Sequence, residues 1–199
     1  RQSRGFGFLG ALALVRPEPA APGWLARVSG WTTTVVREAA AELVSASVLM
    51  QDAGGRLAFP DERARDRATE SATEAEISTA HGLIARWMGQ LGNASPAQRA
   101  WHEEHAAPAG LTDDLARLHL EAGRTHLTQC DAVRALWHFD CAIRRTADPI
   151  ALREALEGRA DALLLQDRNK EALAAYLQVF DQTTDPHLAL QIANRVVHA

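Results

Sequence analysis

Apolar positions in the first part of the chain recur at helical spacing and are interrupted by proline and glycine. The run from Gly5 to Val15 predicts a first helix, which ends before Pro17 and Pro19 because proline cannot continue a helix. A shorter segment around Pro22 to Val28 predicts a second helix that ends at Gly30. The chain therefore begins with two short helices joined by a proline-rich turn.

The next segment combines a longer amphipathic helix with a hairpin. Thr32 to Thr34 offer hydroxyl groups that can cap a helix, and an apolar stripe with a spacing of three and four follows them. The stripe consists of Val35, Val36, Ala39, Ala40, Leu43 and Val44. Val48 to Met50 and Arg56 to Phe59 flank the turn-forming stretch Asp52 to Gly55 and predict two short strands. Three helices followed by a hairpin predict a winged-helix-like module.

From about Thr73 onward the pattern predicts helices alone. Stretches of roughly fifteen residues with apolar spacing of three and four are separated by short loops, which is typical of stacked helical hairpins. The loops lie at residues 92–95, 108–112, 148–149, 167–169 and 185–186. We therefore expect two domains, a winged-helix-like module at 1–72 and a helical-repeat region at 73–199.

An internal repeat is the most specific pattern in the helical region. A set of positions recurs 37 residues later with the small, aromatic, small spacing of a tetratricopeptide repeat. The first copy consists of Ala122-Gly123, His126, Ala135, Phe139, Ala142 and Asp148-Pro149, and the second of Arg159-Ala160, Leu163, Ala172, Tyr176, Val179 and Asp185-Pro186. The segment from His187 to His198 predicts the first half of a third copy, so we expect a solenoid truncated at its C-terminus. The predicted fold is mainly α, with a winged-helix-like module and a small β-hairpin followed by a tetratricopeptide-like α-solenoid.

The composition and the net charge indicate which classes of function the protein is expected to have. The 199 residues are 47% hydrophobic and 23% charged, which is enough to bury a sizeable core. The formal net charge of −4 argues against a nucleic-acid binder, which needs a clustered basic face. The predicted third helix carries one cation, Arg37, beside Glu38 and Glu42. We therefore expect a protein partner or a small-molecule effector, and no direct nucleic-acid contact.

The number of cysteines and the character of the N-terminal segment indicate the cellular compartment in which the protein is expected. Cys130 and Cys141 are too few for a disulfide scaffold and lack the spacing of a structural zinc site, which favours a reducing environment. Arg1 and Arg4 with the apolar run that follows imitate a secretory signal. The run is shorter than the roughly 20 apolar residues of a membrane span and fits a buried helix better. We expect a cytoplasmic protein without membrane contact.

Several motifs resemble, in their order and spacing, the central part of LuxR-type ATP-dependent transcriptional regulators. They are the run from Arg37 to Leu49, the segment from Gly55 to Phe59, the isolated His81, and Gln98 to His102. The chain departs from the family pattern at Asp61, where the family carries a histidine. The resemblance covers essentially the whole chain and implies a winged helix between a signal-transduction ATPase and a helical-repeat sensor.

The resemblance implies a regulatory segment and not an enzyme. The GxxxxGK[ST] phosphate loop does not occur, and Gly5 to Gly10 lacks its lysine and hydroxyl, so we expect no cofactor here. The helical repeats are expected to bind an effector or protein partner and to bias the ATPase module of the parent chain through the winged helix. A free-standing tetratricopeptide-like adaptor is the alternative.

A metal-dependent hydrolase is a third possibility, raised by His102 to His105. Two histidines one helical turn apart flank two glutamates, but their spacing is three and not the four of a zincin motif. A second ligand motif does not accompany them. We expect His102 to cap or to pack within a helix hairpin and His105 to be solvated.

The candidate site residues lie in the first copy of the repeat. His119 and His126 are two turns apart on one predicted helix. Trp137 is adjacent to the inward row of Phe139 on the next helix and so faces another side of that helix. We predict that His119, His126 and Trp137 belong to a partner or effector surface. Catalytic, cofactor-binding and metal-binding residues are not expected.

Overall fold

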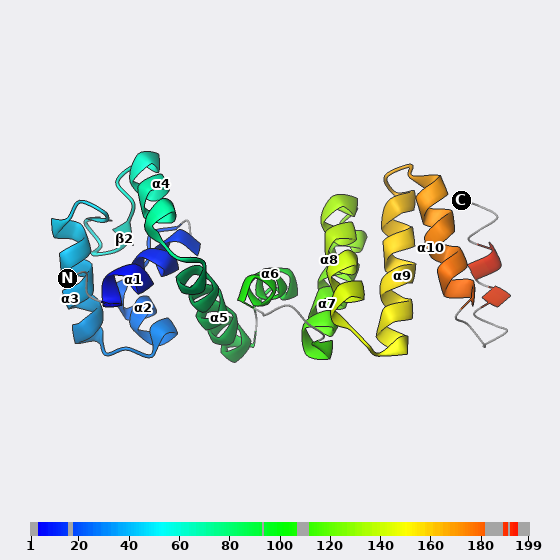
Figure 1. Ribbon diagram of the computed structural model, residues 1–199, viewed down its shortest axis with the longest axis horizontal. Helices are drawn as coiled ribbons and strands as arrows, with labels where there is room; N and C mark the ends of the chain where they lie inside the picture. Colours follow the sequence, from blue (N-terminus) through cyan, green and yellow to red (C-terminus); the bar gives the residue numbers. More distant parts are fainter. Residues whose placement is uncertain are drawn as a thin grey trace. The chain divides into compact units, whose positions relative to one another are not determined.

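The chain folds into helices with one small antiparallel hairpin, as predicted (Figure 1). The computed structural model describes residues 4–15, 18–92, 94–106, 112–181, 189–190 and 192–194. The chain divides into two compact units, of which the first comprises residues 1–94 and 102–107, and the second 95–101 and 108–199. This division differs from the boundary predicted between residues 72 and 73.

The first unit contains five helices and the hairpin within its described residues. They are α1 (Arg4–Val15), α2 (Pro22–Ser29), α3 (Thr33–Ser45), β1 (Met50–Gln51), β2 (Leu57–Ala58), α4 (Glu62–Ser71) and α5 (Glu74–Leu91). Helix α2 ends at Gly30, whose positive φ of 72° suits a residue without a side chain. Helix α3 begins after Thr32, whose hydroxyl accepts a hydrogen bond from the backbone N–H of Val35. Local capping therefore sets these ends where the sequence predicts them.

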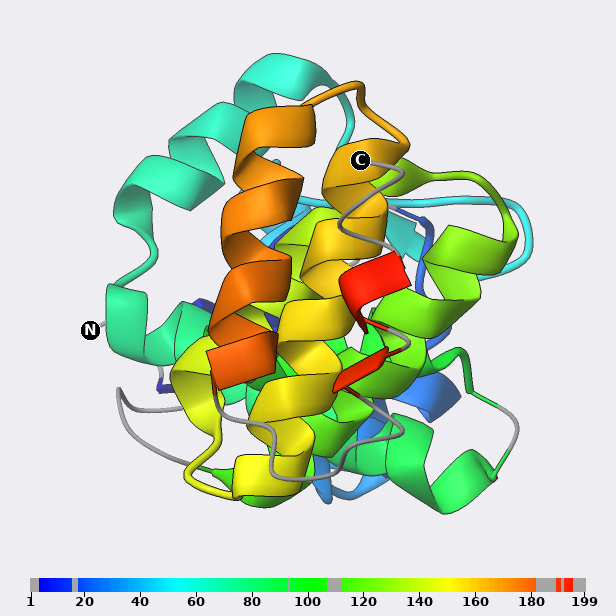
Figure 2. The same ribbon diagram turned by 90° about the vertical axis from the view of Figure 1, so that its right-hand side faces the viewer.

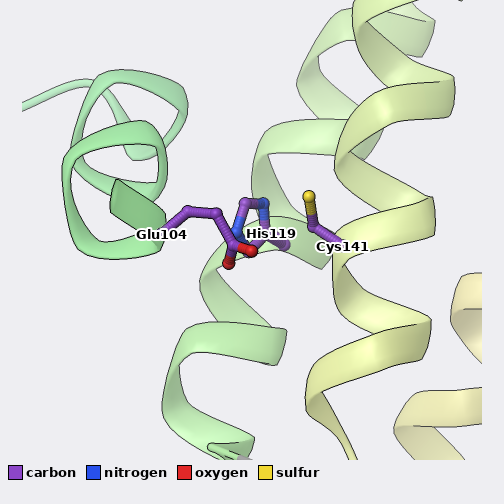
Figure 3. A group of neighbouring side chains, drawn as sticks. All are labelled: Glu104, His119 and Cys141. Atoms are coloured by element: carbon purple, nitrogen blue, oxygen red, sulfur yellow. The ribbon is translucent and has the colours of Figure 1, made fainter. Parts of the chain in front are cut away.

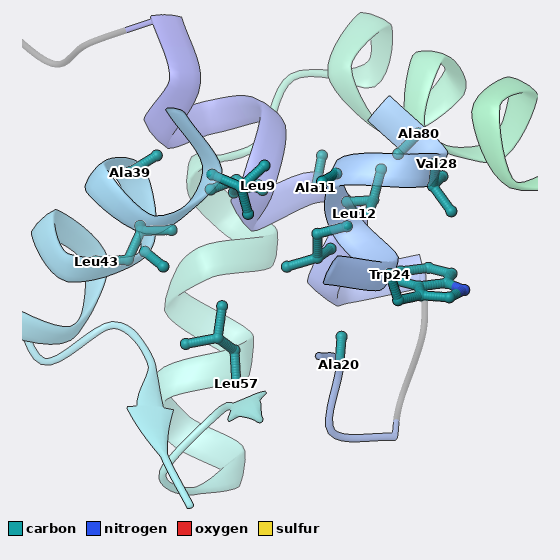
Figure 4. Packing of buried hydrophobic residues seen from close by; sticks show 14 of the residues in the cluster. Leu9, Ala11, Leu12, Ala20, Trp24, Val28, Ala39, Leu43, Leu57 and Ala80 are labelled. Atoms are coloured by element: carbon teal, nitrogen blue, oxygen red, sulfur yellow. The ribbon is translucent and has the colours of Figure 1, made fainter. Parts of the chain in front are cut away.

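The core of the first unit gathers side chains from helices α1, α2, α3 and α5 and from the hairpin (Figure 4). Leu12 of α1 and Leu43 of α3 are fully buried, and Leu57 of β2 joins them. Ala80 and Ile84 of α5 belong to the same core, because α5 packs on α1 and α2. This packing places α5 in the first unit and moves the division beyond residue 72.

The hairpin lies where the sequence predicts it, and a third segment of backbone pairs with its second strand. Met50 pairs with Ala58 in antiparallel register, and the side chain of Asp52 accepts hydrogen bonds from the backbone of Gly54 and Arg56 to close the turn. Ala20 also forms an antiparallel bridge with Leu57. The sequence predicts strands only at Val48 to Met50 and Arg56 to Phe59, so the pairing of Ala20 is not predicted.

The second unit consists of sequentially packed antiparallel helices. They are α7 (Asp113–Thr128), α8 (Ala132–Arg145), α9 (Pro149–Leu164) and α10 (Asn169–Asp181). Helix α6 (Pro96–Ala106) crosses the division, with residues 95–101 in the second unit and 102–107 in the first. Helices α9 and α10 lie side by side in Figure 2. Asp185-Pro186, which end the predicted second copy, lie outside the described residues, as do His187 and His198, which bound the predicted third copy.

The two predicted copies of the repeat have matching burial. Four equivalent small or aromatic positions are buried in both copies: Gly123, Ala135, Phe139 and Ala142 in the first, and Ala160, Ala172, Tyr176 and Val179 in the second. The ring of Phe139 lies against Gly123 of α7 and Gly158 of α9, since a Cβ added at Gly123 would lie 2.8 Å from its Cε1 atom. Glycine at these two positions lets the three helices approach closely.

The turns within the two copies are also equivalent. Cys130 and Asp167, which are 37 residues apart, both adopt a φ of 57°. The residue after each one donates a backbone hydrogen bond to a helix carbonyl, from Asp131 to His126 and from Arg168 to Leu163. The internal repeat is therefore a repeat of backbone geometry as well as of residue type.

Candidate functional site

Six of the eight histidines form two clusters of similar geometry, one in each unit. The α5–α6 cluster consists of His81, His102 and His105, and the α7–α8 cluster of His119, His126 and His138. Each contains a pair of rings whose Nδ1 atoms lie 3.0 Å apart (His81 and His102) or 2.9 Å apart (His119 and His138). In each, a third ring stacks on one member of the pair. We treat these clusters as the candidate sites.

The α7–α8 cluster contains two of the predicted site residues. Helix α7 places His119 and His126 on its buried face, and α8 places His138 between them. The rings of His126 and His138 stack with centroids 5.3 Å apart. Sequence reasoning did not single out His138, although its place directly before Phe139 puts it at the border of the inward face of α8.

Trp137 is the third predicted site residue and is 37% exposed. Its indole makes edge contacts with the rings of His119 and His138, at centroid distances of 5.5 Å and 4.8 Å. The structure therefore brings the predicted residues into one neighbourhood. His119 and His126 are nevertheless buried, and of the three predicted surface residues only Trp137 is substantially exposed.

Burial controls the charge of the α7–α8 cluster. Desolvation, and then repulsion from His119 and His126, lowers the pKa of His138 to about 3, so this ring is neutral at pH 7. A neutral imidazole has one N–H and one bare nitrogen, and the 2.9 Å contact with His119 therefore requires one donating and one accepting Nδ1. The buried Nδ1 of His126 lies 3.6 Å from Asp131 and has no hydrogen-bond partner.

The second unit also pairs an imidazole with a thiol. His119 on α7 and Cys141 on α8 lie side by side and are both buried, with a ring nitrogen and Sγ within 4.8 Å (Figure 3). Imidazole nitrogen and thiolate sulfur are ligands that zinc accepts, but two of them supply half of a tetrahedral site. Arg144 donates a hydrogen bond to Sγ at 3.1 Å, and its positive guanidinium would repel a metal cation at this position.

The α5–α6 cluster is formed by His81 of α5 and two residues of α6. His81 and His102 are buried, whereas His105 is exposed, which confirms the placement predicted for His102 and His105. Desolvation, followed by repulsion from neighbouring histidines, lowers the pKa of both His81 and His102 to about 4. The ring of His105 stacks on that of His81 at 4.9 Å. Stacked rings do not aim their nitrogens at one point, as metal coordination requires.

An open hollow lies in the first unit, between helices α2 and α3 and the hairpin. Its volume is about 710 Å³, within the range of small-molecule sites. Thr33, Arg37 and Gln51 contribute polar groups to a lining that is otherwise largely apolar or small. The hollow offers one cationic group, so its chemistry is less specific than that of the histidine clusters.

None of the described helices combines the length and the apolar character needed to cross a membrane. The chain matches no protein-family model, no curated protein and no solved structure.

Proposed function

We propose that the chain is a regulatory and interaction segment of a LuxR-family ATP-dependent transcriptional regulator and not an enzyme. In this proposal the first unit is a winged-helix-like module and the second a tetratricopeptide-like solenoid that binds a protein partner or effector. Support comes from the order of the sequence motifs, the three helices with a hairpin, and the sequentially packed helix pairs that follow.

An exposed apolar stripe on α8 is the observation that carries this proposal. Val133 is 72% exposed and Trp137 is 37% exposed, and one helical turn separates them. Tryptophan is enriched among the residues that contribute most to binding energy at protein interfaces. Behind the indole lie the rings of His119 and His138, which hold it in a fixed position. Trp137 is therefore the proposed anchor for the partner.

The first unit is proposed to transmit a signal and not to read DNA. Helix α3 exposes Arg37 together with Glu38 and Glu42, so the helix that would enter a major groove can neutralise almost no phosphate. The same unit instead offers an open hollow and a short hairpin for contact with the proposed ATPase module.

The test uses the full-length parent protein and a transcription reporter. We expect its coding sequence to contain a phosphate loop before this segment and a basic helix-turn-helix after it. Trp137→Ala should reduce effector-dependent transcription by about tenfold or more, as expected for an interface anchor. Leu165→Ala is the matched control, because Leu165 is 55% exposed on the same unit but lies in the turn after α9.

Two outcomes would contradict the proposal. Normal effector response in Trp137→Ala, at an expression level equal to the parent, would show that this stripe is not the binding surface. A coding sequence without either flanking motif would favour the free-standing adaptor instead.

A further inference from the structure

We infer that His81 and His102 form an acid-labile clasp, which holds the C-terminal half of α6 against α5 and opens when both rings are protonated. This inference goes beyond the proposed function, because it assigns a proton-sensitive device to the first unit whatever its partner. It stands on the contact between the two Nδ1 atoms and on the packing around it.

The clasp lies in a close contact between α5 and α6. The hydroxyl of Ser78 donates a hydrogen bond to the carbonyl of Ala106 at 3.3 Å. Gly82 faces Ala106 so closely that an added Cβ would lie 3.5 Å from the alanine Cβ. One turn earlier on α6, the Nδ1 atoms of His81 and His102 lie 3.0 Å apart. The pair is therefore a buried polar contact within this short interface.

The clasp lies on α6, the helix in which the division between the two units falls. Residues 102–107 belong to the first unit and residues 95–101 to the second, although both stretches lie largely within the single helix α6. A change that releases the end of α6 from α5 therefore acts on the segment through which the chain passes from one unit to the other.

Protonation opens the clasp in two steps. In the neutral pair, one Nδ1 donates its proton and the other accepts it. A first proton taken up at the donor ring's Nε2 leaves this hydrogen bond intact. A second proton must enter the accepting ring, where it occupies the accepting Nδ1 and leaves two cationic rings with facing N–H groups. The contact then becomes repulsive.

Glu103 and Glu104 follow His102 on α6, and neither carboxylate is among the causes that shift the pKa of the two rings. The charged neighbours that shift the pKa of His81 are His102 and His105, and for His102 the neighbour is His105. Helices α1 and α2, which pack on α5, carry Arg4 and Arg27 as their charged residues. Burial and repulsion lower the pKa of both clasp rings to about 4, so the clasp is closed near neutral pH and opens in acid.

Hydrogen exchange measured by mass spectrometry at pH 7 and pH 4, corrected for intrinsic rates, tests the clasp in the whole chain. In the parent, protection of residues 102–106 should fall by about tenfold or more in acid, because protonation replaces the hydrogen bond between the two rings with repulsion. Peptides from α1 should remain protected, because they report the core of the same unit.

Two variants distinguish opening of the clasp from other effects of low pH on the chain. His102→Asn keeps an amide that can accept a hydrogen bond from a protonated His81 and removes the repulsion between the two rings, so its α6 peptides should show a clearly smaller acid-dependent loss of protection than the parent. His138→Asn alters the equivalent pair in the other unit and should leave the acid response of α6 unchanged.

Three results would overturn the inference. They are equal protection of residues 102–106 at both pH values in the parent, an undiminished acid response in His102→Asn, and loss of α1 protection at the same pH as α6. Long-range ¹H–¹⁵N spectra of the parent give a check that needs no variant. We expect one ring of the pair to carry its proton on Nδ1, and two Nε2–H tautomers would exclude the clasp.

Discussion

The ring of Phe139 shows how one residue fixes the packing of three helices. It is buried between Gly123 of α7 and Gly158 of α9, and it projects from α8. Helical spacing within the repeat predicts this inward orientation. The partners of the ring, in contrast, depend on how neighbouring helices approach.

Replacing Phe139 with alanine should destabilise the chain by about 3–5 kcal/mol, the usual cost of removing a buried aromatic side chain. Urea denaturation followed by circular dichroism measures the change. Phe180→Ala is the control, because Phe180 is 43% exposed on α10 and its loss should cost much less. Coincident denaturation midpoints for Phe139→Ala and the parent would show that this register of the repeat is wrong.

Substituting Gly158 with alanine should destabilise the chain by about 1–3 kcal/mol, the usual cost of overpacking a core. The new Cβ would collide with the ring of Phe139, and this clash outweighs the better helix propensity of alanine. Gly23→Ala in α2 is the control, because a Cβ there meets nothing within 4 Å. Equal thermal midpoints for Gly158→Ala and Gly23→Ala would contradict the packing described for Phe139.

At the scale of elements, histidine pairs join α5 to α6 and α7 to α8. A hydrophobic interface would not respond to pH, whereas these pairs require neutral rings. The helices themselves form from local sequence, whereas part of the contact within each of these two helix pairs depends on neutral histidine rings. Acid should therefore weaken contacts between helices before it weakens the helices.

His138 predicts a specific pH dependence for the α7–α8 contact. Its pKa is about 3 in the folded chain and near 6.5 when unfolded, so the unfolded chain binds its proton first as the pH falls. Its contribution to stability is complete above pH 6.5 and decreases below it, by about 1.4 kcal/mol per pH unit until the folded pKa is reached. Urea midpoints at pH 7, 5.5 and 4 measure this slope.

The variant His138→Gln isolates that contribution, because glutamine does not titrate. Its stability should fall less steeply between pH 6.5 and 4 than that of the parent. The α5–α6 histidines are present in both proteins. Their contribution to the pH dependence of stability is therefore the same in both and does not affect the difference. Parallel pH profiles would mean that His138 is not buried in neutral form.

At the scale of the whole molecule, charge and the absence of a phosphate loop determine what the chain is expected not to bind. The net charge is −4, and the exposed residues of α3 include Arg37 together with Glu38 and Glu42. We expect neither duplex DNA nor ATP to bind with micromolar affinity, even at low salt, where electrostatic attraction is strongest.

Fluorescence anisotropy with labelled duplex DNA and a fluorescent nucleotide analogue tests this expectation. Arg37→Ala and the parent are compared at low salt and at physiological salt. Micromolar DNA binding that is lost in Arg37→Ala would identify α3 as a recognition helix and overturn the proposed role of the first unit.

The sequence alone determined the features that depend on local spacing. The apolar stripe of α3, the turn from Asp52 to Gly55, and the alternation of helix and loop after Thr73 specify elements through residues within one or two turns of each other. The repeat added a prediction about packing, because Phe139 and Tyr176 occupy equivalent positions and are both buried. Helical spacing likewise placed His119 and His126 on one face.

The tertiary structure decided the features that join distant segments. Ala20 pairs with Leu57, and α5 adds Ala80 to the first core, so the division between units follows packing and not the change in pattern near Thr73. The partner of His119 is His138, because the approach of α7 and α8 sets which side chains face each other. Spacing along one helix gives the direction of each side chain, but only the register between helices determines which two imidazoles share a proton.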